Sequence, residues 1–144
     1  MKLKLIYSFS IIALLILISS CGKSTENKIV GTWNKISVGP INSTTNVWTF
    51  TADHHLYVTR TTVIDSTSSS IQQDTATWSI SIHTFSKNTL KINQVNAAKN
   101  IAFPHVEGEF EIRELNDILV LQRFKLGNGE TDGAYAWHEF EKTK

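Results

Sequence analysis

The chain has 144 residues, of which 41% are hydrophobic and 19% charged, and it contains one cysteine. This length fits one modest domain rather than a multi-domain enzyme, and a single cysteine excludes an internal disulfide. Without Lys2 and Lys4 at the amino terminus, 12 basic and 13 acidic side chains remain. The chain therefore lacks the positive charge typical of proteins that bind nucleic acids.

Residues 1–20 have the order of a secretory signal peptide. A short basic segment ending at Lys4 precedes an apolar run over residues 5–18, and small residues lead from there into Cys21. As a helix, this run would span about 21 Å, which is short of the roughly 30 Å of a bilayer core. The run therefore suits a signal sequence better than a permanent membrane span.

The residues before Cys21 resemble the lipobox of bacterial lipoproteins, in which an aliphatic residue and two small residues precede a cysteine. The resemblance implies that the Cys21 thiol carries diacylglycerol, that residues 1–20 are removed, and that the new amino terminus is acylated, for example with palmitate. Several acyl chains hold a protein on a membrane far longer than one chain does. Residues 21–28 are accordingly predicted to be the lipidated cysteine and a short flexible tether. The alternatives are an uncleaved anchor and a buried free thiol.

Gly22 occupies the position where an aspartate would imply retention at the inner membrane. By the same resemblance, the expected location is the outer membrane of a bacterium. Whether the domain faces the periplasm or the cell surface stays open.

The remaining sequence consists of short runs in which apolar and polar side chains alternate, separated by turn residues. This period of two is typical of strands with one buried face. It has no exception over residues 75–82, where Ala76, Trp78, Ile80 and Ile82 share one face that is expected to be dry. In chain order, strands are predicted at residues 29–38, 47–52, 56–64, 75–82, 90–95, 109–115, 118–125 and 134–141.

Eight strands joined mostly by hairpin-length links predict an all-β domain over residues 29–144. The favoured arrangement is a single antiparallel up-and-down barrel, because closure removes exposed strand edges, and a β-sandwich is the main rival. An eight-stranded barrel can just hold one small ligand. Eight side chains are expected to point inward, where they either fill a solid core or line a cavity for a small hydrophobic molecule: Trp48, Phe50, Trp78, Ile80, Leu90, Ile92, Phe110 and Ile112.

Two segments resemble bacterial lipocalin-like domains of lipoproteins. Residues 29–33 read Ile-Val-Gly-Thr-Trp and residues 48–53 read Trp-Thr-Phe-Thr-Ala-Asp, which match a first strand with Gly-x-Trp and the hairpin that follows it. His54 and His55 replace the glycine usual in that hairpin, so a different turn type is expected.

The same resemblance implies a lipocalin-like barrel with Trp33 closing one end. In this family an arginine near the carboxyl terminus stacks on that tryptophan, and Arg123 is the nearest candidate. The alternative is that Arg123 pairs with Glu139 or Glu141 on the outer face.

No arrangement of residues predicts catalysis, a cofactor or a metal ion. His54 and His55 are adjacent and would point to opposite sheet faces, while the other histidines lie far apart along the chain. Glu107, Glu109 and Glu111 share one strand face with an arginine, which is typical of a solvated exterior. The chain also lacks a nucleophile elbow and a glycine-rich phosphate loop, so the protein is predicted not to be an enzyme.

The leading hypothesis is a lipid-anchored, non-enzymatic protein of the cell envelope that binds a small hydrophobic ligand in its barrel. The alternative is an interaction or inhibitor module that contacts an unidentified protein partner through the loops at residues 42–46, 65–70 and 96–105. A third possibility is an envelope hydrolase whose site the sequence does not reveal.

Overall fold

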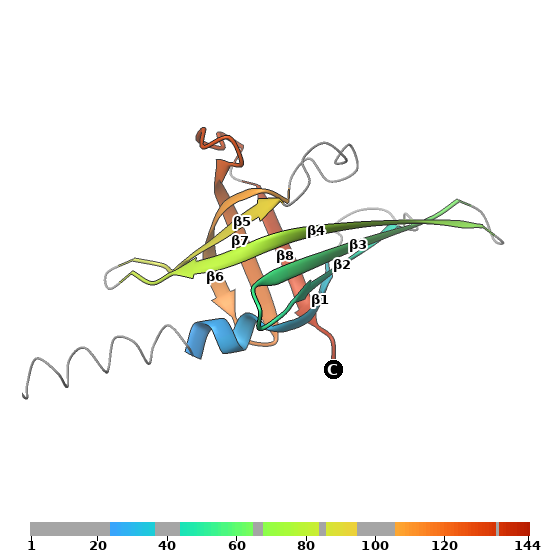
Figure 1. The fold of residues 1–144 in the computed structure, drawn as a ribbon, viewed down its shortest axis with the longest axis horizontal. Helices are drawn as coiled ribbons and strands as arrows, with labels where there is room; N and C mark the ends of the chain where they lie inside the picture. The colour runs from blue at the N-terminus through green and yellow to red at the C-terminus, as the bar shows by residue number, and fades with distance from the viewer. Residues whose placement is uncertain (1–23, 37–43, 65–67, 84–85, 95–105, 135) are drawn as a thin grey trace, which may run out of the picture.

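The computed structural model describes residues 24–36, 44–64, 68–83, 86–94, 106–134 and 136–144. Its eight strands form one closed antiparallel barrel in which each strand pairs with the next and β8 pairs with β1 (Figure 1). The predicted up-and-down barrel is therefore confirmed, and the sandwich is excluded. The strands are β1 Gly31–Lys35, β2 Thr44–Phe50, β3 His55–Val63, β4 Ser69–Ser81, β5 Thr89–Gln94, β6 Gly108–Leu115, β7 Ile118–Leu126 and β8 Trp137–Lys142.

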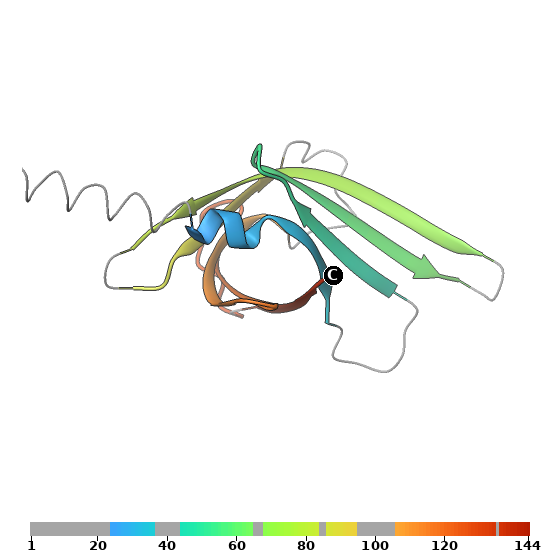
Figure 2. The same cartoon turned by 90° about the horizontal axis from the view of Figure 1, so that it is seen from below.

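Strands β2 and β4 begin earlier than the hydrophobic pattern predicts, whereas β3 keeps its predicted length and is shifted by one residue. The pairs Thr44↔Thr62 and Val63↔Ser69 extend the ladder into residues expected to be loop. Threonine is well suited to strands, so this polar stretch keeps the extended conformation although it has little apolar surface to bury. As a result, β3 and β4 project as a ribbon beyond the rest of the barrel (Figures 1 and 2).

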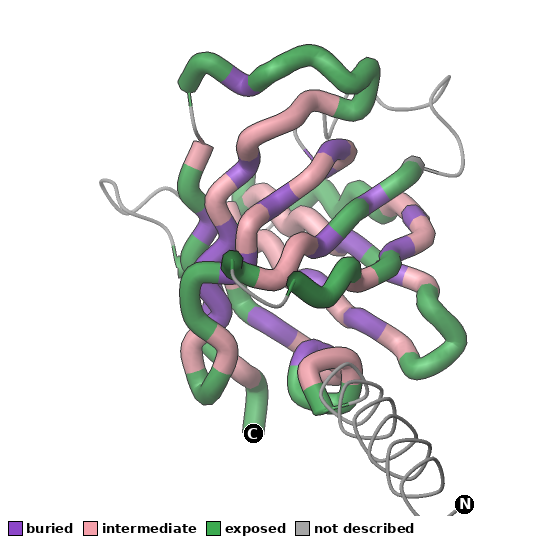
Figure 3. The backbone as a smooth tube through the Cα atoms, turned by 90° about the vertical axis from the view of Figure 1, so that its left-hand side faces the viewer, coloured by how far each residue is buried: buried purple, intermediate pink, exposed green. Residues whose placement is uncertain are grey.

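The core fills the barrel interior. Buried and less buried segments alternate along the strands (Figure 3), as expected when every second side chain points inward. Ala76 and Trp78 are 2% and 3% exposed, so the predicted orientation of β4 is confirmed for them. Ile82 is the exception, because β4 ends at Ser81 and leaves this side chain 36% exposed.

A short helix covers the lower end of the barrel in Figure 1. Residues 24–29 are helical, where a flexible tether was expected up to residue 28 and a strand from residue 29. Asn88 Nδ2 donates a hydrogen bond to Thr25 Oγ1 (3.3 Å), and Lys142 Nζ donates one to the Lys28 carbonyl (3.1 Å). These contacts tie the helix to the strands, which explains why the segment is ordered despite its polar composition.

The Trp33 side chain lies at this end of the barrel, beside the helix. Its side chain is fully buried and donates a hydrogen bond from Nε1 to the Ile29 carbonyl (2.7 Å). The ammonium group of Lys142 lies 5.0 Å from the Trp33 ring centroid, within the range of a cation–π contact. Gly31 has a φ of 135°, which side chains rarely adopt, and it lets the chain turn from the helix into β1.

Arg123 has neither of its expected roles. It lies near the opposite end of β7 from the Trp33 side of the barrel, and its Nε donates a hydrogen bond to Asp132 Oδ2 (2.7 Å). Both side chains are only 6% exposed, so the ion pair is buried rather than placed on the outer face with Glu139 or Glu141. The hydrogen bond from Arg123 is the main cause of the lowered pKa of the Asp132 carboxyl.

Candidate functional site

The side chains expected to line a ligand cavity point inward, but they pack against one another. Seven of the eight are at most 7% exposed, and Ile80 is partly buried against the same cluster. The Phe50 and Trp78 ring centroids are 5.6 Å apart, and those of Trp48 and Phe140 are 4.7 Å apart. Side chains that solvent does not reach do not line an open cavity. These residues therefore form a filled core.

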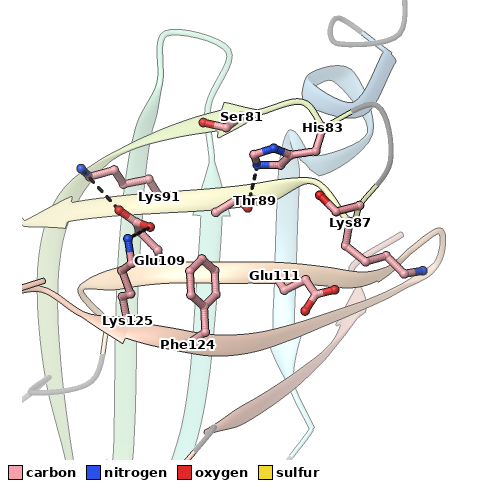
Figure 4. Close-up of a pocket in the computed structure, with 10 residues that line it drawn as sticks. Ser81, His83, Lys87, Thr89, Lys91, Glu109, Glu111, Phe124 and Lys125 are labelled. Atoms are coloured by element: carbon pink, nitrogen blue, oxygen red, sulfur yellow. Dashed lines mark hydrogen bonds and ion pairs between the residues drawn. The ribbon is translucent and has the colours of Figure 1, made fainter. Parts of the chain in front are cut away.

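The outer wall of the barrel instead carries a groove of about 620 Å³. Ligand-binding pockets commonly measure about 300–1,000 Å³. The groove begins at the connection between β4 and β5 and continues over the outer faces of β5, β6 and β7 (Figure 4). We call it the wall groove, and its lining residues are Ser81, His83, Ser86, Lys87, Thr89, Lys91, Glu109, Glu111, Phe124 and Lys125.

Strand pairing places the charged side chains of the wall groove in one row. Lys91 pairs with Glu109, and Glu109 pairs with Lys125, so all three project from the same level of neighbouring strands. The Glu109 carboxylate lies 3.8 Å from Lys91 Nζ and 3.2 Å from Lys125 Nζ. One carboxylate thus bridges two ammonium groups and leaves this row with a net positive charge.

A β-bulge brings an aromatic ring into the wall groove. Glu109 is opposite Lys125 but Phe110 is opposite Arg123, so Phe124 is an extra residue in β7. The extra residue turns Lys125 to the outside, although the side chain two positions earlier points inward. The Phe124 ring stands between Glu109 and Glu111, which both lie on β6, and points toward Thr89 on β5 (Figure 4).

A second row of polar groups lies next to the ring. Thr89 pairs with Glu111 across β5 and β6, and Glu111 forms an ion pair with Arg113 at 2.8 Å. His83 Nε2 lies 3.2 Å from Thr89 Oγ1, while Lys87 extends over the groove from the β4–β5 connection (Figure 4). The groove thus offers an aromatic ring surrounded by hydrogen-bond donors, acceptors and an excess of cations.

The His83–Thr89 contact is the arrangement in this groove that comes closest to a nucleophile and a base. An activated hydroxyl needs a base that a third group holds in position. Among the described residues, no carboxylate is bonded to the second ring nitrogen of His83, and both side chains are exposed. The His83–Thr89 pair therefore lacks, among the described residues, a carboxylate that would hold the imidazole in position.

The described histidines are not grouped around a common centre. The His54 ring is tilted by 45° against that of Trp78, with the ring centroids 4.8 Å apart, and His55 Nδ1 lies 3.0 Å from Asp53 Oδ2. His138 is 7% exposed inside the barrel. Within the described ranges, no three histidine, cysteine or acidic side chains are placed to hold a metal ion.

Lys35, at the end of β1, has a lowered pKa. Burial is the larger cause, and the positive charge of Arg60 is the second.

Some of the residues singled out from the sequence lie outside the described residues. They are Cys21, His105, the expected loop at residues 96–105 and parts of the other two expected loops.

Sequence comparisons found no relative of this chain. No protein-family model matches it, and no curated protein shows significant similarity to it. Across the part of the chain that the structure describes, no helix has the length and apolar character needed to cross a bilayer. The function therefore has to be argued from the barrel and the wall groove themselves.

Proposed function

We propose that this protein is a non-enzymatic binding protein of the bacterial cell envelope, anchored through lipid on Cys21, with the barrel as a scaffold for a ligand site in the wall groove. The observation that carries the proposal is the contrast between the two candidate sites. Seven of the eight expected interior side chains are at most 7% exposed, whereas the groove outside is concave and polar around an aromatic ring. A filled barrel favours recognition on its surface over an enclosed hydrophobic ligand.

The anchoring part of the proposal is tested at Cys21. The full chain is expressed in bacteria that are fed an alkyne-tagged fatty acid, and label and membrane association are measured for the parent, Cys21→Ala and Ser20→Ala. We expect Cys21→Ala to lose the label and leave the membrane fraction, because the thiol that receives the lipid is gone. Ser20→Ala keeps a small residue before the cysteine and should behave like the parent. Equal labelling of all three proteins would refute the anchor.

The binding part is tested with an apolar probe. The purified full chain in detergent is titrated with a long-chain fatty acid while tryptophan emission is recorded, because Trp48 and Trp78 lie inside the barrel. We expect no saturable change beyond that of detergent alone, since neither ring borders open space. One-to-one saturation with a shifted emission would show that the barrel opens to a hydrophobic ligand, and it would favour the interior site over the wall groove.

A further inference from the structure

We infer that the wall groove binds an acidic saccharide, a sugar chain whose rings carry carboxylates. The inference deepens the proposed function and rests on it, because it names the ligand class of the same groove. Three features of the groove support it: the aromatic ring, the mixture of charges and the excess of cations.

The Phe124 ring provides the apolar platform. It is partly buried in the wall groove at the β7 bulge, and Lys125 Nζ lies 5.9 Å from its centroid. A pyranose ring has a flat face of C–H groups, which can cover an aromatic ring while the hydroxyls around its edge stay available for hydrogen bonds. A groove of about 620 Å³ has room for more than one such ring.

The mixture of charges favours hydroxyl groups as ligand atoms. A simple anion such as phosphate would meet Glu109 and Glu111, and a simple cation would meet three lysines. A sugar hydroxyl both donates and accepts hydrogen bonds, so it can satisfy a carboxylate and an ammonium group in the same site. Thr89 and His83 add neutral polar partners beside the ring.

The excess of cations favours an acidic sugar over a neutral one. Three lysines and two glutamates line the wall groove, and one of these glutamates, Glu111, is already paired with Arg113. Glu109 is shared between Lys91 and Lys125 and offsets only one of their two charges. Ligand carboxylates would complete this arrangement.

The experiment uses the full chain in deuterated detergent micelles and saturation-transfer NMR. The probes are trigalacturonate, its methyl ester, which keeps the ring and its hydroxyls but not the charge, and triglutamate, which has the charge without the sugar. We expect trigalacturonate to receive saturation at its ring protons, and the ester to bind about fivefold more weakly, as for the loss of an exposed ion pair. Triglutamate should bind more weakly than trigalacturonate.

Matched variants locate the binding site. Phe124→Leu should strongly reduce saturation transfer, whereas Trp137→Leu changes an aromatic ring that is 55% exposed elsewhere on the outer surface and should have no effect. Lys87→Gln should weaken trigalacturonate more than its ester, and Lys144→Gln at the carboxyl terminus should change neither. Circular dichroism confirms that each variant is folded, and Lys87→Gln still tests the groove if Phe124→Leu is not.

Equal binding of acid and ester, equal binding of triglutamate, no effect of the Phe124 and Lys87 variants, or no saturation transfer to any probe would each overturn the inference. These failures differ from failure of the proposed function. A chain that binds trigalacturonate but carries no lipid refutes the anchor alone, whereas a lipidated chain that binds none of the probes refutes the saccharide class alone.

Discussion

Removing the Trp78 side chain tests whether the interior is a packed core. The ring is 3% exposed, and its centroid lies 5.6 Å from that of Phe50 in an edge-to-face arrangement. Its Nε1 donates a hydrogen bond to the His55 carbonyl at 3.1 Å. Replacing a buried tryptophan with alanine typically costs about 3–5 kcal/mol. Small domains are stable by only about 5–15 kcal/mol, so Trp78→Ala would remove a large part of the total.

The contacts of Trp78 also predict an intermediate variant. Trp78→Phe keeps most of the apolar volume but removes the indole N–H, and a hydrogen bond of this kind contributes about 1 kcal/mol. Allowing for a less complete contact with Phe50, we expect Trp78→Phe to lose about 1–2 kcal/mol. The order of stability should be parent, Trp78→Phe, Trp78→Ala.

The assay is urea unfolding of the chain from residue 22 onward, followed by far-ultraviolet circular dichroism because the substitutions remove a fluorophore. With a slope of about 1–3 kcal/mol per molar urea, Trp78→Ala should lower the midpoint by about 1 M or more. Trp137→Ala is the matched control, since this ring is 55% exposed and should cost less than about 1 kcal/mol. A parental midpoint for Trp78→Ala with an unchanged slope would mean that Trp78 faces solvent and that the register of β4 is inverted.

Two further predictions concern polar contacts at the two barrel ends. The folded-state pKa of Asp132 is lowered by its hydrogen bond from Arg123, so this carboxylate stabilises the fold above its unfolded pKa of about 3.9, and the contribution is lost as the pH falls through the lower folded value. Urea midpoints from pH 7 to 2 should therefore show the difference between the parent and Asp132→Asn shrinking below about pH 4, and a constant difference would contradict the lowered pKa. Lys142→Met keeps the methylenes near Trp33 but removes the cation, which should cost about 0.5–1 kcal/mol, whereas Lys144→Met at the carboxyl terminus should match the parent. Equal midpoints for the two lysine variants would show that the contact does not stabilise the protein.

The alternation of apolar and polar residues predicted the fold because it indicates which face of each strand is buried. The pattern in β4 placed Trp78 inside, and the polar residues Glu109 and Glu111 were correctly assigned to the exterior face of β6. The same reasoning ended β4 one residue too late, at Ile82, and began it six residues too late, at residue 75 instead of Ser69, because the polar half of the strand has no apolar face to indicate it. Tertiary pairing with β3 decides those positions instead.

The hairpin between β2 and β3 contains a backbone conformation that alternation does not predict. A different turn type was expected because His54 and His55 replace a glycine, and His54 has a φ of 64°, in the left-handed region. Such a conformation costs roughly 1–2 kcal/mol outside glycine. The His54 carbonyl accepts a hydrogen bond from the Trp78 backbone N–H at 2.9 Å, and its ring packs on the Trp78 ring, so tertiary contacts offset the strain.

The wall groove could not be predicted because it depends on one bulge. Strict alternation in β7 would put Arg123 and Lys125 on the same face, yet the extra residue sends Arg123 inward and Lys125 outward. Phe124 gains its place in the groove by the same irregularity. The bulge depends on how β7 pairs with β6 once the barrel has formed, and no residue type in β7 indicates it in the sequence.

The proposed anchor and the wall groove also fit together in space. The helix of residues 24–29 meets the barrel at the end where Trp33 lies, and the groove begins at the β4–β5 connection, which Asn88 ties to the same helix. Two residues lie between Cys21 and residue 24, so three steps of at most about 3.6 Å each would keep residue 24 within roughly 11 Å of a lipid anchor at Cys21. With the barrel axis along the membrane normal, a groove that opens along the barrel wall would face sideways, parallel to the membrane surface. Acidic sugars attached to neighbouring lipids would then reach the Phe124 ring at a high local concentration, so weak binding to each sugar unit would suffice for retention.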